Sequence, residues 1–561
     1  MNSPRIGWKD VVFVGLCLAG AATFVGAMLR RDRVTTPRDF QPLRFVSATP
    51  ASDPADPRAV RDRIDADFRA LWQKKQLQPT DRADDLQIAR RISLALTGVV
   101  PSVEEVRSLE EVPERERVEW WVSHLLEDRR YADYVAERFA RVVVGTEDGP
   151  FLRYRRRRFV SWLSDQLHEN KPYDQIVRGL IADHGLWTST PAVNFISVTT
   201  TEANGEQPNE IPLAGRTARA FLGLRIDCLE CHDDKLGTVT LGNEQDSHAG
   251  TQQNFHELAA FFGQAESSLT GIRDNDDLKY EYRYLGHEAK EVVAASVPFN
   301  DQCLSGHGTL REQLATWVTH PQNRPFARVT VNRVWALLFG RPLVEPIDSI
   351  PLHGPWPATM EILADDFIAH GHDLKRLIRI ITASEVFQRD SAADFEITRH
   401  HDENFASFPL TRLRPEQVAS SLVQSACLQT IDADAHILRQ LDLFSKTRDF
   451  TQRYGDPGSD EFTDRGGTIT QRLLMMNGEL VRERTGENIV FNASTRLAAV
   501  CPDNAKAIEA VYLAVLTRRP SEEERSLFVE RFGTRQGDFR RAPIEDLYWI
   551  LINSTEFSWN H

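Results

Sequence analysis

The sequence predicts a mostly α-helical protein, with two helical domains behind an N-terminal membrane helix and a flexible tether. Three observations predict this class. Apolar residues recur at helical spacing in both halves of the chain, the alternation typical of strands is scarce, and residues 11–29 carry no charge.

Composition excludes several classes of protein. A chain of 561 residues with 41% hydrophobic and 26% charged residues is ordinary for a folded protein of several domains. Its net charge of −14 argues against nucleic-acid binding, which needs a basic surface. Six cysteines are too few for a disulfide scaffold.

Residues 1–33 are predicted to be a transmembrane anchor or signal segment. The uncharged stretch is nearly long enough, as a helix, to cross a hydrocarbon core of about 30 Å. Its small residues Ala19, Ala21, Ala22 and Ala27 do not form a convincing A-x-A cleavage site, so we interpret the segment as an uncleaved anchor, with a removed signal as the alternative. Arg5 and Lys9 precede it, and Arg30, Arg31 and Arg33 follow, a weak bias toward a cytoplasmic body. The cysteine motif described below requires export, and large bodies are often translocated regardless of loop charge. We therefore expect a membrane-anchored protein whose body faces the periplasm or the cell exterior.

The rest of the chain divides into four predicted segments. Residues 34–61, rich in Pro, Asp, Ser and Thr, read as a linker. A helical domain at 62–270, a connector at 271–310 and a second helical domain at 311–561 follow.

Local patterns predict individual elements. Ser102 with Glu105, and Ser521 with Glu524, have the spacing of capping boxes and predict helix starts. Apolar residues follow the helical repeat within 118–126, 135–142, 362–368 and 374–381. Residues 195–201 are the best candidate for a strand. Segments 183–215 and 234–252 lack periodicity and are predicted to be long loops, which are often functional.

One motif carries recognisable chemistry. Cys228-Leu229-Glu230-Cys231-His232 has the C-x-x-C-H pattern of c-type haem attachment. Two thiols three positions apart on a turn can each add to one vinyl group of a porphyrin, and the next residue can then bind the iron. The motif predicts haem c attached through Cys228 and Cys231, with His232 as axial iron ligand.

Other uses of the motif stay open. The cysteines could form a disulfide or redox pair, bind zinc with His232 and Asp233 or Asp234, or remain buried reduced thiols. No thioredoxin-like βαβ pattern surrounds them, and no second C-x-x-C or H-x-x-x-H accompanies them. Asp233, Asp234, His248 and His256 are candidates to support the iron ligand or to bind an alternative metal. The sixth iron ligand is not identified.

Ordered motifs extend over most of the chain. The first half contains Arg90-Arg91-Ile92-Ser93-Leu94, Asn170-Lys171-Pro172-Tyr173-Asp174 and Phe221-Leu222-Gly223-Leu224-Arg225. The second half contains a stretch at 323–335, Gly371-His372-Asp373-Leu374-Lys375, Arg412-Leu413-Arg414-Pro415-Glu416 and a stretch at 551–557. In these motifs the chain resembles the planctomycete cytochrome-associated two-domain family, in which a PSCyt-type domain of unknown function precedes a PSD-type domain of unknown function.

The resemblance implies an exported or membrane-attached bacterial protein that is often found alongside cytochrome c modules. It implies no activity. The family usually continues past the cysteines with His-x-His-Pro, where this sequence has His232-Asp233-Asp234-Lys235. Any role of the family's second histidine is therefore lost here or passes to Asp234.

The leading hypothesis is a c-type-cytochrome-like protein in electron transfer or haem-linked redox chemistry with a redox partner protein. It would contact the membrane through its N-terminal helix and bind no nucleic acid. The alternative is a non-redox surface or scaffold protein whose Cys pair is structural, as a disulfide or a metal site. The sequence has no phosphate-binding loop, G-x-S-x-G or H-E-x-x-H motif, and it indicates neither a catalytic residue nor an oligomeric state.

Overall fold

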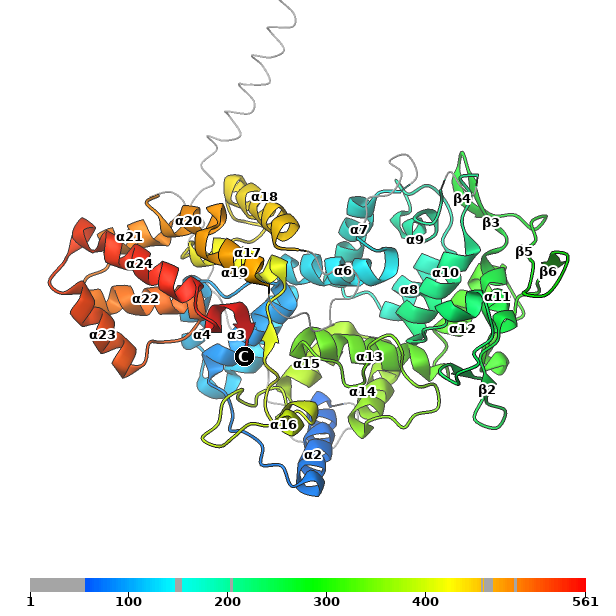
Figure 1. The fold of residues 1–561 in the computed structure, drawn as a ribbon, viewed down its shortest axis with the longest axis horizontal. Coiled ribbons are helices and arrows are strands. Elements are labelled where there is room, and N and C mark those ends of the chain that lie inside the picture. Colours follow the sequence, from blue (N-terminus) through cyan, green and yellow to red (C-terminus); the bar gives the residue numbers. More distant parts are fainter. Residues whose placement is uncertain (1–55, 147–153, 202–204, 456–457, 459–467, 489–491) are drawn as a thin grey trace, which may run out of the picture. The chain divides into compact units, whose positions relative to one another are not determined.

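A computed structural model describes residues 56–146, 154–201, 205–455, 458, 468–488 and 492–561. Over these residues the chain is mostly helical, as predicted (Figure 1). The predicted membrane segment at 11–29 and most of the linker lie outside the described residues. Among the helices that are described, none combines the length and the apolar character needed to cross a bilayer.

The first half of the described chain is built from short and medium helices. They are α2 (Pro57–Lys75), α3 (Asp85–Thr97), α4 (Val103–Glu110), α5 (Arg117–Glu127), α6 (Arg129–Val144), α7 (Arg156–His168), α8 (Tyr173–Ala182), α9 (Asn194–Ser197), α10 (Glu210–Thr217) and α11 (Gln252–Ala259). The 3-10 turns η1 (Glu114–Glu116), η2 (Pro191–Val193), η5 (Asp227–Glu230), η6 (Ala260–Phe262) and η7 (Asp301–Cys303) connect them, and α10 runs directly into a π-helical turn, η4 (Ala218–Leu222).

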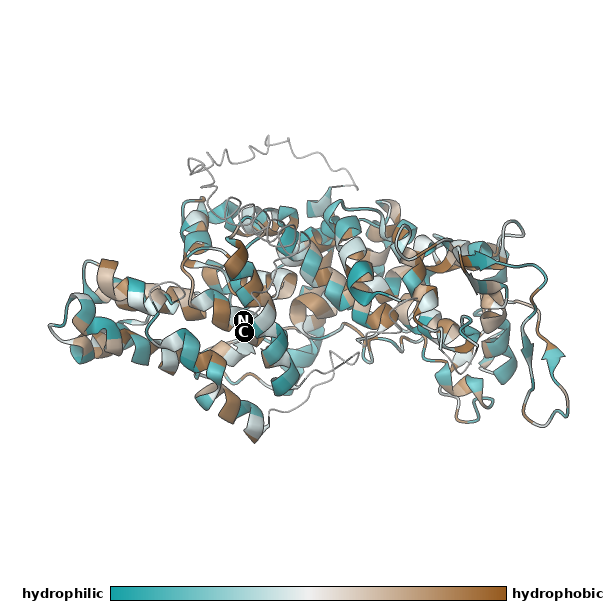
Figure 2. Ribbon diagram, turned by 90° about the horizontal axis from the view of Figure 1, so that it is seen from above, coloured by the Kyte–Doolittle hydropathy of each residue, from teal (hydrophilic) through white to brown (hydrophobic). Residues whose placement is uncertain are grey.

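The second half is also helical. It comprises α12 (Leu310–Val318), α13 (Arg324–Phe339), α14 (Ala358–Ala369), α15 (Leu374–Ala383), α16 (Arg399–Glu403), α17 (Pro415–Ser425), α18 (Ile437–Tyr454), α19 (Ile469–Asn477), α20 (Glu479–Thr485), α21 (Ala493–Val500), α22 (Asn504–Leu516), α23 (Glu522–Phe532) and α24 (Arg541–Ile552), with the 3-10 turns η8 (Gly537–Arg540) and η9 (Glu556–Ser558). Most helices carry both apolar and polar residues (Figure 2).

Strands are few and short. The described residues form four two-stranded antiparallel ribbons. They pair β1 (Thr240–Leu241) with β2 (His248–Ala249), β3 (Ala265–Ser268) with β4 (Gly271–Asp274), β5 (Glu281–Tyr282) with β6 (Glu291–Val292), and β7 (Thr411–Arg412) with β8 (Trp559–Asn560). The prediction of a strand at 195–201 is wrong. The neighbours Phe195 and Ile196 are both fully buried, in the helical turn α9, whereas a half-buried strand would bury only one of them.

Both predicted capping boxes are confirmed. The Ser102 hydroxyl accepts from the backbone N–H of Glu105 at 3.0 Å, while the Glu105 carboxylate accepts from the backbone N–H of Ser102 at 2.8 Å. Ser521 and Glu524 make the same exchange at the start of α23. Upstream, α2 begins at Pro57 with Asp56 as its N-cap, inside the stretch predicted as linker.

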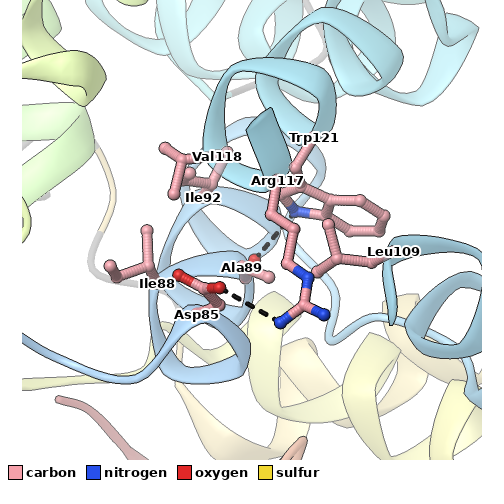
Figure 3. A pocket seen from close by; sticks show the side chains of 8 residues that line it. All are labelled: Asp85, Ile88, Ala89, Ile92, Leu109, Arg117, Val118 and Trp121. Atoms are coloured by element: carbon pink, nitrogen blue, oxygen red, sulfur yellow. Dashed lines mark hydrogen bonds and ion pairs between the residues drawn. The ribbon is translucent and has the colours of Figure 1, made fainter. Parts of the chain in front are cut away.

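Helix α3 lies in the apolar core. Its Ile88, Ile92 and Leu96 are wholly buried. The Trp121 indole N–H donates to the Ala89 carbonyl at 3.1 Å, and Arg117 pairs with Asp85 at 3.3 Å (Figure 3). The side chains drawn there fill the space between α3 and α5, which leaves no room for a ligand.

The arginines of the first motif bind main-chain oxygens far along the chain. Arg90 donates to the carbonyls of Val515 and Phe557 at 3.1 and 3.3 Å. Arg91 donates to three carbonyls, at 2.6 Å to Arg389 and His561 and at 3.4 Å to Phe387. Burial lowers the pKa of Arg90 to about 10 and that of Arg91 to about 9, so both stay charged at neutral pH.

Other motifs of the sequence also contact one another across long distances in the chain, as those at 170–174 and 371–375 do. The Tyr173 N–H donates to the His372 carbonyl at 3.1 Å, and the His372 ring lies 3.5 Å from an Asp174 oxygen. The Gln417 amide donates to the Leu94 carbonyl at 2.8 Å. The described residues, which begin at Asp56, form one compact unit. The domain boundaries at 62–270 and 311–561 stay predictions.

We expect R91M to lower the free energy of unfolding by about 2–3 kcal/mol, because three main-chain carbonyls lose a buried donor. Urea denaturation measures the change. R115M, on the exposed turn η1, is the control and should cost less than about 0.5 kcal/mol. Equal stabilities of R91M and the wild type would show that the buried guanidinium contributes nothing.

Candidate functional site

The cysteine motif lies on a short 3-10 turn. After η4 the chain turns at Gly223, whose φ is 65° and whose carbonyl accepts from the Ile350 N–H at 2.8 Å. A Cβ at Gly223 would come within 3.1 Å of the Val329 side chain, so glycine is needed there on both counts. The motif follows on η5, where Leu229 N–H donates to Ile226 O at 2.9 Å.

The cysteines of the turn are exposed, whereas Leu229 between them is buried. Cys231 caps η5, and its backbone N–H donates to the Cys228 carbonyl at 3.4 Å. Side chains three positions apart in such a turn lie above one another, so we infer that Cys228 and Cys231 share one face. Both cysteines are exposed and carry free thiols. Leu229 has no exposed surface and anchors the turn in the core. The turn therefore exposes both cysteines to solvent, while the buried Leu229 side chain anchors it in the core.

His232 has the tautomer expected of a metal ligand. Its ring is exposed, and Nδ1 lies 2.8 Å from the carbonyl oxygen of Asp233. A carbonyl can only accept, so we assign the proton to Nδ1, which leaves the lone pair on Nε2. Histidines that bind metals usually donate their other ring N–H in this way.

The two aspartates after His232 cap the loop. Asp233 accepts from the N–H of Gln252, the first residue of α11, at 2.8 Å. Asp234 accepts from the Val239 N–H at 2.6 Å and the Leu236 N–H at 2.9 Å. These backbone hydrogen bonds, that of Val239 foremost, lower the pKa of Asp234 below its ordinary value. Both carboxylates thus serve main-chain donors.

The two candidate histidines have different surroundings. His248 is exposed on β2, with Nδ1 2.9 Å from the Ala249 carbonyl. His256 is fully buried on α11, and burial lowers the pKa of its ring. Both of its nitrogens are engaged, Nδ1 by the Tyr280 hydroxyl at 2.8 Å and Nε2 by the Glu230 carbonyl at 3.0 Å. In the part of the chain that the structure describes, no three His, Cys, Asp or Glu side chains gather as a metal-binding group.

The Glu230 carbonyl, in the middle of the motif, receives three donors. His256 Nε2 and the Gln252 amide each lie 3.0 Å away, and the Tyr282 hydroxyl lies 3.2 Å away. Sequence reasoning singled out His256 but missed the other two. Gln252 lies inside the Thr251–Asn254 capping box, which could have located the start of α11. Tyr282 carries no local signal, because it lies 52 positions from its partner.

The segment that contains the motif is rich in acidic residues. Between residues 227 and 301, Asp and Glu outnumber Lys and Arg three to one. Asp227, Glu244, Asp246, Glu281 and Glu288 are all exposed. This segment therefore carries a net negative charge, with several of its carboxylates on the surface.

Two family models match successive parts of the chain. Residues 63–267 match the PSCyt2 family, described as a protein of unknown function (DUF1549), and residues 310–532 match the PSD1 family, described as a protein of unknown function (DUF1553). The chain belongs to the two-domain family in which a PSCyt2 domain precedes a PSD1 domain, which confirms the resemblance seen in the motifs. No curated protein and no solved structure matches it significantly.

Gly250 packs directly against the anchor of the motif turn. A Cβ there would lie 2.6 Å from Leu229 Cδ1 and 3.1 Å from Val239 Cγ1. We expect G250A to lower the free energy of unfolding by about 1–3 kcal/mol, as overpacking of a closed core does. Thermal denaturation measures this change. G306A, where an added Cβ would meet nothing within 4 Å, is the control and should be neutral. A G250A protein as stable as G306A would mean that Leu229 is not held tightly.

Proposed function

We propose that this protein is an exported, membrane-anchored, c-type-cytochrome-like protein that takes part in electron transfer or haem-linked redox chemistry. One observation carries the proposal: two free, exposed cysteines lie three positions apart on one turn, next to a histidine whose Nδ1 is engaged by the Asp233 carbonyl and whose Nε2 is therefore assigned the lone pair. This donor set fits haem c, which needs two reactive thiols and a neutral imidazole.

Each residue of the motif has a defined role in this proposal. Cys228 and Cys231 would hold the haem, each thiol adding across one vinyl group with its proton passing to the other vinyl carbon. His232 would bind the iron through Nε2, while the Asp233 carbonyl holds Nδ1–H and so keeps the ring in one orientation. Bound haem would supply a one-electron carrier.

The alternative, a scaffold protein whose cysteines tie down a loop, has less support. The turn is already held by the buried Leu229 side chain and by three hydrogen bonds to the Glu230 carbonyl. Neither thiol takes part in these contacts. A disulfide or a zinc ion would add little to a loop that is fixed without it.

The net negative charge of residues 227–301, the segment that contains the motif, favours a basic redox partner. Charge of one sign near a redox group raises the association rate of an oppositely charged protein, and salt weakens this effect. Export is proposed together with the haem, because covalent attachment through C-x-x-C-H requires the exported compartment that the N-terminal segment at 11–29 would provide.

The first test is covalent haem. Protein made with haem-attachment machinery should be red, should keep its colour after acid–acetone extraction, and should show one haem on the peptide that carries Cys228 and Cys231 in mass spectrometry. The double variant C228S/C231S should be colourless, whereas C501S, at a half-buried free cysteine, should bind as much haem as the wild type. A colourless wild-type protein, with these cysteines unmodified or disulfide-linked, would refute the proposal.

The second test is topology. If the body lies outside the cytoplasm, protease added to intact spheroplasts should digest it, and a cytoplasmic marker protein should survive. Lysed cells provide the control that the body is cleavable. Full protection in intact spheroplasts would place the body in the cytoplasm and contradict the proposed export.

A further inference from the structure

The backbone between the two cysteines is held by more donors than a carbonyl usually receives. Glu230 O has two lone pairs, and three N–H or O–H groups from α11 and β5 converge on it at 3.0–3.2 Å. Gln252 and Tyr282 also bond to each other, at 3.3 Å, so two of the donors share one network. The position of this carbonyl is therefore fixed from two separate elements.

His256 is the buried member of this network. Its ring has no exposed surface and stacks on Tyr282 with ring centres 3.4 Å apart. The Tyr280 hydroxyl can donate to Nδ1, which places the ring proton on Nε2, facing Glu230. Both nitrogens have partners inside the fold, so His256 is a donor to the motif backbone and is not available as an iron ligand.

The network acts on the main chain alone. Each of the three hydrogen bonds ends on the backbone oxygen of Glu230 rather than on its side chain, on a thiol or on the His232 ring. The same contacts are therefore compatible with free and with modified cysteines. A ligand set held in place before it binds its group needs less reorganisation on binding.

We propose that His256 is a positioning residue for haem attachment and iron ligation: its Nε2–H holds the Glu230 carbonyl and so sets the relative placement of Cys228, Cys231 and His232. This inference rests on the proposed function. Gln252 and Tyr282 assist, and His256 carries the largest share because it is the one donor buried completely.

Two substitutions at one position separate the hydrogen bond from simple packing. H256L removes the donor, whereas H256Q keeps an N–H at the end of the side chain and should rescue. H248L, at the exposed histidine of β2, is the matched control. In haem-free, reduced full-length protein, the alkylation rates of Cys228 and Cys231 are measured by mass spectrometry, with Cys501 as the internal reference. H256L should raise the rates at both motif cysteines about fivefold to tenfold, and H256Q and H248L less than about twofold.

The haem-loaded proteins give the second readout. H256L should shift the reduction potential and raise the pH at which His232 leaves the iron on acidification, while H256Q and H248L should match the wild type. Unchanged alkylation, potential and ligand release in H256L would overturn the positioning role. Because the alkylation assay needs no haem, a wild-type protein that stays colourless would refute the proposed function and leave the alkylation result to decide the role of His256 in fixing the turn.

Discussion

Two adjacent buried arginines link the start of the described fold to its end. Arg90 and Arg91 stand on α3, yet their partners are main-chain carbonyls near residues 387–389, 515 and 557–561. A guanidinium offers five N–H donors in a plane, so one residue can hold several chain segments at once. The rest of the fold depends on this contact, because it brings segments more than 400 positions apart into one core.

The motifs that mark the family are mostly structural. Tyr173 and Asp174 contact His372, and Asn332 hydrogen-bonds to both polar backbone groups of Val344. Leu94, in the first motif, accepts from the Gln417 amide through its carbonyl. These polar residues satisfy main-chain groups inside a largely apolar core, where an unpaired carbonyl or N–H is costly. The residues with recognisable reactive groups, Cys228, Cys231 and His232, lie together on one exposed turn. The proposed function therefore depends on five consecutive residues.

Local sequence signals predicted much of the architecture, but contacts between residues far apart in the sequence could not be predicted from it. The capping boxes at Ser102 and Ser521 depend on residues three positions apart and could be read directly from the sequence. The strand expected at 195–201 is a helical turn, since burial of two neighbouring apolar residues leaves no alternation. At the candidate site the motif itself was readable. The hydrogen bond from Tyr282 to the Glu230 carbonyl could not be predicted, because only tertiary folding brings these two residues together.

The use of a backbone oxygen at position 230 has an evolutionary consequence. Any amino acid offers a carbonyl, so natural selection acting on the turn would tolerate a wide range of residues between Leu229 and Cys231. Position 229 is different, because a smaller side chain there would leave space beside Gly250 unfilled, and a polar one would bury a polar group in an apolar site. Orthologous chains should therefore vary in sequence at the position of Glu230 and keep an aliphatic residue at the position of Leu229.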